Sequence, residues 1–243
     1  MKHIIILILL LSTHLLMAQK KTDTKALEIV KKSVKAHGGD AYKNLNVSFD
    51  FRQFQYKIVL NKSKYLYQRT FQDSIGNTIV DLLDNGLFSR TVNGNKIELT
   101  ERDHGRFKEA TNSVAYFMLL PYKLLDKAVN LEYLGETDFE NNKYYKIKVW
   151  FDEEGGGKDF EDVYCYWINQ SNYQVDFLAY ANGGPRLRKV STTDRVGKVL
   201  FQNYDNYQIL DKEIPATAYD QAFKEGKYKL LSKIEQSNYK LNK

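Results

Sequence analysis

The amino-acid sequence predicts a mainly β protein of the α+β class, a curved antiparallel half-barrel of about 11–12 strands with an N-terminal helix and a mid-chain helical lid. Three observations lead to this prediction. From residue 46 onward, apolar and polar residues alternate with the two-residue period of strands. Turn-forming residues recur about every ten positions. Helical periodicity occurs near the start of the chain and again in its middle.

Glycine and asparagine mark the turns between the expected strands. Asn-Gly pairs favour tight hairpins, because both central residues must tolerate a positive φ. Such signals occur at Gly76-Asn77, Asn85-Gly86, Asn93-Gly94, Asn141-Asn142, Gly183-Gly184, Val196-Gly197 and Glu225-Gly226. Short strands in series with evenly spaced turns indicate an antiparallel meander.

The first expected strand contains a change of phase. Phe49 and Phe51 lie on one face, whereas Phe54 and Tyr56 continue the apolar pattern one position out of step. A slip of one residue is typical of a β-bulge, so the pattern predicts a bulge in one long, curved strand.

Two segments have helical spacing. Residues 24–36 place apolar side chains on one face and lysines on the other, and His37-Gly38-Gly39 provides the C-terminal cap. A helical insert is expected over residues 103–128, interrupted by Pro121. Residues 115–120 are apolar nearly all round, so the insert must be covered on several sides.

The first 18 residues have the layout of a secretory signal peptide, with Lys2, an apolar run and the small residue Ala18 at the cleavage site. This run is too short to span a membrane, which takes roughly 20 apolar residues, and no later stretch qualifies. Gln19 stands where a lipoprotein would need cysteine. The mature chain is therefore expected to be periplasmic, with neither a lipid anchor nor a membrane span.

Residues 19–243 are expected to form a single domain, because the chain has only three prolines and no linker-like stretch divides it. The protein is also expected to be a monomer. The net charge of +6 becomes +5 once Lys2 is removed, since residues 1–18 hold no acid. The charges are interspersed and form no basic block, which argues against nucleic acid as a partner.

No catalytic or metal-binding motif stands out, and no cofactor is expected. His37 and His104 have no nearby ligand partners, and Cys165 lies in an apolar run typical of a buried thiol. The acidic, glycine-rich stretch 153–162 lacks the residues of a phosphate loop or an EF-hand and is expected to be a charged hairpin loop.

The 18 tyrosines and 13 phenylalanines suit either a wide aromatic core or an apolar pocket. If there is a pocket, the aromatic strands and the apolar insert should line it, with an arginine for a polar head group. The candidate ligand-binding residues are Phe49, Phe51, Arg52, Phe107, Tyr116, Phe117 and Leu120.

Several short segments resemble a family of exported proteins from flavobacterium-like bacteria, described as a domain of unknown function. They include Ala36-His37-Gly38-Gly39-Asp40, Tyr67-Gln68-Arg69-Thr70-Phe71, Leu119-Leu120-Pro121-Tyr122-Lys123-Leu124 and Gly155-Gly156-Gly157-Lys158-Asp159-Phe160. The order of elements is also similar to the lipoprotein carrier and receptor group, LolA and LolB. That resemblance implies a curved half-barrel with inserted helices covering its concave face.

The leading hypothesis is a non-enzymatic periplasmic binding protein for a lipid, a lipoprotein acyl chain or another apolar ligand, including a lipidated protein. Two alternatives stay open. One is an envelope interaction module with a filled core. The other is an enzyme, such as a hydrolase or an aldolase, although an aldolase of the (β/α)₈ type would need alternating strands and helices, which this chain lacks.

Overall fold

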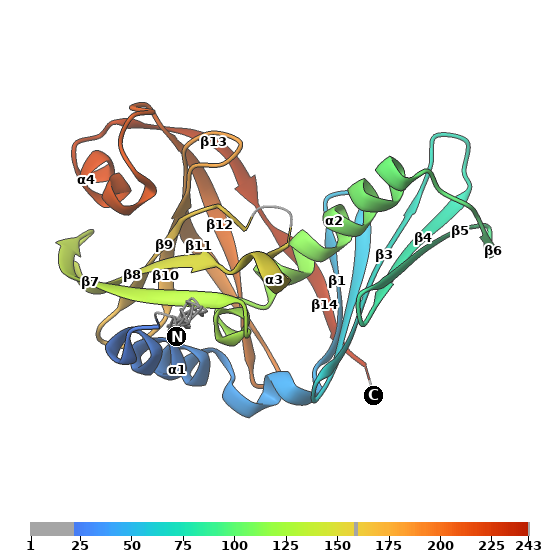
Figure 1. Cartoon of the computed structure of the whole chain (residues 1–243), viewed down its shortest axis with the longest axis horizontal. Coiled ribbons are helices and arrows are strands. Elements are labelled where there is room, and N and C mark those ends of the chain that lie inside the picture. The colour runs from blue at the N-terminus through green and yellow to red at the C-terminus, as the bar shows by residue number, and fades with distance from the viewer. Residues whose placement is uncertain (1–21, 158–159, 243) are drawn as a thin grey trace, which may run out of the picture.

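The computed structural model of the chain describes residues 22–157 and 160–242. The predicted signal peptide, residues 1–18, lies outside the described residues. Two antiparallel sheets of seven strands each make up most of the molecule, and they diverge from one another with helix α2 between them (Figure 1).

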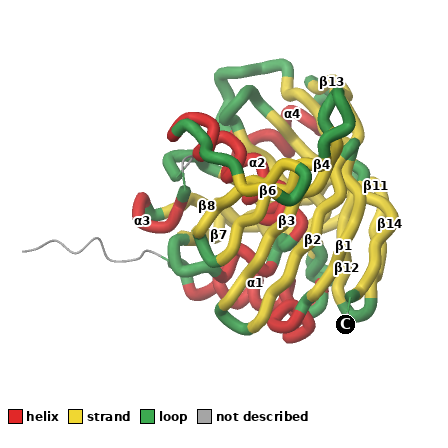
Figure 2. Tube along the Cα trace, turned by 90° about the vertical axis from the view of Figure 1, so that its right-hand side faces the viewer, coloured by secondary structure: helices red, strands yellow, loops and turns green. Residues whose placement is uncertain are grey.

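The first sheet, sheet A, has the strand order β14-β1-β2-β3-β4-β5-β6. Figure 2 shows β14, β1, β2 and β3 side by side. Its strands are β1 (Asn46–Phe51), β2 (Phe54–Asn61), β3 (Lys64–Gln72), β4 (Thr78–Asp84), β5 (Leu87–Val92), β6 (Asn95–Lys96) and β14 (Gln236–Leu241).

The second sheet, sheet B, has the order β13-β12-β11-β10-β9-β8-β7. Its strands are β7 (Val129–Phe139), β8 (Asn142–Phe151), β9 (Tyr164–Asn169), β10 (Val175–Tyr180), β11 (Arg186–Val196), β12 (Val199–Ile209) and β13 (Tyr228–Ile234). The chain passes from sheet B to sheet A through Glu235, between β13 and β14.

The predicted fold class is confirmed: the chain is mainly antiparallel β, with an N-terminal helix and a mid-chain helix. The described residues form 14 strands, more than the 11–12 expected. Part of the difference comes from the short strand β6, and part from the division of the expected first strand into β1 and β2.

The predicted bulge between Phe51 and Phe54 is wrong. Phe51 pairs directly with Phe54, so Arg52 and Gln53 form a two-residue hairpin turn between β1 and β2. Arg52 adopts a positive φ of 56° to make the turn. A chain reversal through two residues puts both flanking aromatics on the same face, and in the sequence this looks like a slip of one residue.

Helix α1 (Thr24–His37) packs its apolar face on sheet B and begins at the N-cap Asp23. Asp23 Oδ1 accepts hydrogen bonds from the backbone N–H groups of Lys25 and Ala26, at 2.7 and 3.4 Å. The predicted cap at the other end is confirmed, because Gly38 has a φ of 148°. A Cβ there would lie 3.1 Å from the carbonyl oxygen of Lys198, so a side chain would also be crowded.

Helix α2 (Glu101–Met118) is the main part of the predicted insert and lies on β3, β4 and β5 of sheet A. The chain then passes Pro121 into the short helix η2 (Tyr122–Leu125). The remaining short helices are η1 (Gly39–Asn44), α3 (Glu153–Gly156), η3 (Ala216–Ala218) and α4 (Tyr219–Lys224).

Buried apolar residues form three clusters. One lies between α1 and sheet B, and a second lies on the inner face of sheet A, where the first residues of β12 join it. The third lies on the opposite face of sheet B, beneath η3 and α4. It contains Cys165, whose prediction as a buried thiol is confirmed; burial raises the pKa of this thiol above its usual range.

Candidate functional site: two clefts beside helix α2

Helix α2 presents three different faces to its surroundings, because side chains three or four positions apart share a face. Thr111, Ala115 and Met118 are buried. A second face, with Lys108 and Asn112, borders a polar cleft, and a third face borders an apolar cleft. The helix therefore separates two concave sites.

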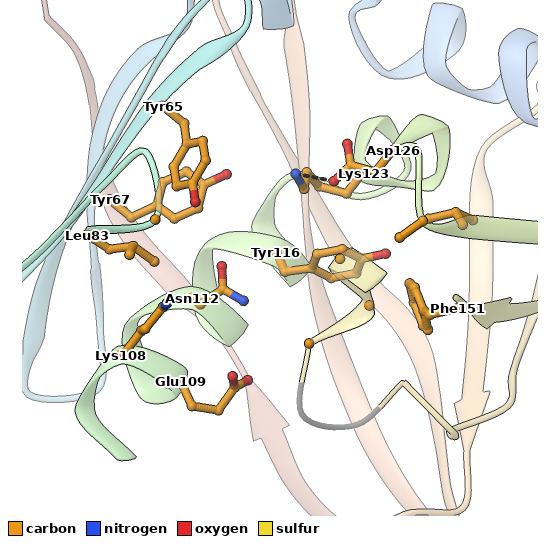
Figure 3. A pocket seen from close by; sticks show the side chains of 16 residues that line it. Tyr65, Tyr67, Leu83, Lys108, Glu109, Asn112, Tyr116, Lys123, Asp126 and Phe151 are labelled. Carbon is orange, nitrogen blue, oxygen red and sulfur yellow. Dashed lines mark ion pairs between the residues drawn. The ribbon is translucent and has the colours of Figure 1, made fainter. Parts of the chain in front are cut away.

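The polar cleft has a volume of about 480 Å³ and lies between β3, β4, α2 and η2 (Figure 3). It is lined by Tyr65, Tyr67, Leu83, Gly86, Lys108, Glu109, Asn112, Tyr116, Lys123, Asp126, Ala128, Val129, Phe151 and Gly155–Gly157. Lys123 and Asp126 form an ion pair within it. Positive and negative side chains balance in this lining.

Tyrosine hydroxyls gather in the polar cleft. Burial and the Asp126 carboxylate both raise the pKa values of Tyr65, Tyr67 and Tyr116, so the three phenols are neutral at neutral pH. The Tyr116 hydroxyl is buried, with no hydrogen-bond partner among the described residues.

Gly155–Gly157 of the acidic, glycine-rich stretch form one wall of the polar cleft. As predicted, the stretch connects two paired strands, β8 and β9. Gly155 and Gly157 have φ values of 88° and 82°, and Gly155–Gly157 line the cleft with backbone atoms. Within the described part of the chain, no group of three or more His, Cys, Asp or Glu side chains could hold a metal ion.

The apolar cleft lies on the other flank of α2, where sheets A and B approach each other, and has a volume of about 180 Å³. Most of its lining is apolar: Phe51, Val114, Phe117, Met118, Tyr204 and Ile234. Four polar residues complete it, namely Arg52, Ser113, Arg188 and Gln236. No acidic side chain lines this cleft in the ranges that the structure describes.

Arg188, on β11, has an unusual environment for a half-buried arginine. Its Nη2 donates a hydrogen bond of 2.7 Å to the Tyr180 hydroxyl, and its guanidinium carbon lies 4.2 Å from the ring centroid of Phe117. Its Nε is buried and has no partner among the residues described. Gln236 Oε1 is likewise buried without a partner in the described structure.

A buried charge cluster lies beneath α2 on sheet A, formed by Arg69, Asp81 and Arg90 on three adjacent strands. Arg69 Nε donates to Asp81 Oδ2 at 2.9 Å, and Arg90 Nε donates to Asp81 Oδ1 at 2.5 Å. The guanidinium carbon of Arg90 lies 3.3 Å from the ring centroid of Phe107. Phe107 therefore covers this charge cluster.

The structure distributes the predicted binding residues over several places. Phe51, Arg52 and Phe117 line the apolar cleft, and Tyr116 lines the polar cleft. Phe49 and Leu120 are 1% and 3% exposed and belong to the packed clusters. The part of each residue in ligand binding stays a prediction.

The sequence does not predict that Arg188 and Gln236 line a cleft. Both come from strands far downstream of α2, and nothing in their immediate neighbours marks a site. Their proximity to Phe117 depends on how sheet B approaches sheet A.

Comparison with protein families shows that the chain belongs to a family of unknown function, DUF6503, whose model matches residues 2–236. This confirms the predicted membership of a family without an established function. No curated protein sequence matches the chain.

Several solved structures are similar to the chain. A LolA superfamily protein from Nitrosomonas europaea is 14% identical, with a TM-score of 0.45 over 90% of this chain and 94% of that one. A domain assigned to outer membrane lipoprotein sorting, from Vibrio parahaemolyticus, is 11% identical, with a TM-score of 0.45 over 89% and 92%. A DUF1329 family protein from Desulfovibrio piger is 8% identical, with a TM-score of 0.39 over 89% and 93%. Because these identities and TM-scores are low, the function of the chain is inferred from its own residues.

Proposed function

We propose that the protein is an exported, non-enzymatic binding protein for a ligand with an acyl chain, such as a lipid or the lipid part of a lipoprotein. The apolar cleft beside α2 is the observation that supports this best. It is open between the two sheets, and six of its lining residues are apolar or aromatic. A filled core between the sheets would instead have favoured the interaction module.

Burial of methylene groups would provide the binding free energy. Each CH₂ removed from water contributes about 0.8 kcal/mol. The cleft volume of about 180 Å³ lies below the range of roughly 300–1,000 Å³ typical of ligand sites. A long acyl chain would therefore need α2 to move away from sheet B.

The packing of α2 supports such a movement. The backbone of the helix lies on sheet A, whereas its aromatic contacts with sheet B come from Tyr116 and Phe117. The ring centroids of Phe117 and Tyr180 are 6.2 Å apart, as are those of Tyr116 and Phe151. Separating these two side chains from sheet B would widen the space between the sheets.

We place this activity in the periplasm because the first 18 residues have the features of an export signal, and we propose that the protein acts as a monomer. In the described part of the chain, no helix is both long enough and apolar enough to cross a membrane.

Mass spectrometry of organic extracts tests the proposal. The full chain is expressed in a bacterium, and the exported protein is purified without detergent and extracted. We expect a lipid in near-stoichiometric amount, and its loss in Phe117→Asp, which puts a carboxylate into the apolar cleft. Circular dichroism checks that the strands persist.

Ile75→Asp is the matched control, because it introduces the same carboxylate at a residue that is 82% exposed and lines neither cleft. It should retain the lipid. An empty extract, followed by no uptake of added fatty acid, would reject the proposal in favour of the interaction module.

A further inference from the structure

We infer that the apolar cleft selects acyl ligands whose head group is an oxyanion, a carboxylate or a phosphate, and that Arg188 and Arg52 bind this head. This inference rests on the proposed function and adds the chemistry of the ligand's polar end.

The charge of the cleft lining is the first support. Arg52 and Arg188 contribute two positive charges, and no acidic side chain from the described ranges lines the cleft. In the polar cleft, by contrast, the charges balance, since Lys123 pairs with Asp126 there. At Arg188, an anion entering the apolar cleft would meet uncompensated positive charge in surroundings of lower polarity than water, where electrostatic attraction is stronger.

A comparison of Arg188 with the buried arginines Arg69 and Arg90 gives the second support. Arg69 and Arg90 both donate to the carboxylate of Asp81, as is usual for arginines removed from water. Arg188 instead donates to the neutral hydroxyl of Tyr180, and its Nε is left without an acceptor among the described residues. A buried donor without an acceptor is unfavourable, so an oxyanion at this guanidinium would satisfy it.

The geometry of the guanidinium suits a carboxylate or phosphate. Nε and Nη2 lie on one edge of the guanidinium, and Nη2 has a second proton besides the one directed at Tyr180. Two parallel hydrogen bonds from such an edge match two oxygens of one oxyanion. Stacking on Phe117 fixes the plane of the group.

Arg52 supplies the second cation from sheet A. It lies in the β1–β2 turn with a φ of 56°, a conformation in which asparagine and glycine are more usual. Its side chain is exposed, and its guanidinium carbon lies 5.0 Å from the ring centroid of Phe51. Since Arg52 and Arg188 come from different sheets, an anion bound between them would bridge the opening of the cleft.

Displacement of the neutral dye Nile red from the exported, delipidated protein tests the inference. Four competitors separate the possible sources of binding: oleate, 1-oleoyl lysophosphatidate, oleyl alcohol and inorganic phosphate. We expect the first two to displace the dye at concentrations at least tenfold lower than the alcohol, and phosphate to have no effect at those concentrations.

Substitution of the arginine then assigns the preference. Arg188→Gln should weaken the two anionic ligands at least tenfold, equivalent to about 1.4 kcal/mol, and leave the alcohol unchanged. Arg195→Gln is the control, because Arg195 is exposed, lies on the same strand and lines neither cleft. It should change the affinity for none of these ligands. Arg52→Gln should have a smaller effect, because its guanidinium is exposed to solvent.

Equal affinity for oleate and oleyl alcohol, or an equal loss of both in Arg188→Gln, would overturn the inference and leave the proposed function standing. Displacement by phosphate at the same concentrations as oleate would also overturn it, because the acyl chain would then contribute nothing. If neither the dye nor any amphiphile binds, the proposed function fails as well.

Discussion

The two long helices of the molecule are held in place in very different ways. Helix α1 has six buried residues out of 14, whereas α2 has three out of 18. Beneath α1 lies an apolar cluster, and beneath the first half of α2 lies the charge cluster of Arg69, Asp81 and Arg90.

This difference indicates which helix can move. Separating α1 from sheet B would expose a continuous apolar surface, which is strongly unfavourable. Moving α2 away from sheet B would separate Tyr116 and Phe117 from that sheet and would expose less apolar area, while the charge cluster stays covered on sheet A. Helix α1 is therefore the more firmly held of the two helices, and α2 is the one better suited to change its position.

The largest expected effect comes from placing the same charge under each helix. Val30 in α1 is 0% exposed, so Val30→Asp should cost about 4 kcal/mol or more in the free energy of unfolding. Val114 in α2 is half-buried and lines the apolar cleft, so Val114→Asp should cost less than about 2 kcal/mol and still abolish lipid binding. Urea unfolding measures both, and equal losses would contradict the comparison.

The charge cluster beneath α2 provides the next test. Asp81→Asn leaves two buried arginines without their carboxylate and should cost about 3–5 kcal/mol. The control is Asp103→Asn, which removes an exposed ion pair with Arg106 of 2.9 Å and should cost about 0–1 kcal/mol. If Asp81→Asn were as mild as the control, water would already have access to the cluster.

The two helices also differ in their histidines. His37 in α1 is buried, and its Nδ1 lies 2.9 Å from the carbonyl oxygen of Ser33. Desolvation lowers the pKa of His37 from 6.5 to about 4, so the folded state keeps the ring neutral. In the unfolded chain, His37 binds a proton below about pH 6.5, whereas in the folded protein it stays neutral. The free energy of unfolding should therefore fall by up to about 3 kcal/mol as the pH drops from 6.5 towards 4.

Substitution separates this effect from other titrating groups. His37→Gln should remove that part of the pH dependence, because glutamine does not titrate. His104, in the first turn of α2, is exposed to solvent. Thermal unfolding from pH 7 to pH 4 compares the wild type with His37→Gln, and parallel profiles of the two would refute the assignment.

The smallest expected difference lies at the helix N-caps. Asp23→Ala should cost about 1–2 kcal/mol, because Asp23 caps α1 and also accepts a hydrogen bond of 3.3 Å from the backbone of Tyr133 on β7. Thr100→Ala should cost about 0.5–1 kcal/mol, since Thr100 caps α2 through one bond of 3.2 Å to the Asp103 N–H. The opposite order in urea unfolding would show that α2 is the more firmly anchored helix.

Local patterns in the sequence are sufficient for the two long helices and for the fold class, but they do not predict the short helices η1, η3 and α4. The run from Thr24 to His37 has a clear apolar face and a glycine cap, and the structure ends the helix at that cap. The β1–β2 turn was missed because Arg52-Gln53 lacks glycine and asparagine, although the positive φ of Arg52 is the kind that those residues favour.

The candidate site was less predictable, because it depends on contacts between distant strands. Arg69 and Asp81 occupy inward-facing positions of β3 and β4, so their place in the alternation could have marked a buried ion pair. Arg188 gave no such sign. Arg188 lies on sheet B and contacts Phe117 of α2, which is 71 positions earlier in the chain. The alternation of residues along a strand does not predict how sheet B approaches sheet A and α2.

The pairing of the last strand with the first has a consequence for folding. Strand β14 pairs with β1, and the Asn242 N–H donates to the Asn46 carbonyl at 2.8 Å. A ladder between segments so distant in sequence forms slowly, since a very long loop must close before any hydrogen bond is gained. Sheet A therefore gains its edge strand only after residues 236–241 have been synthesised, and a chain lacking them would have β1 as an unpaired edge, open to association with other chains.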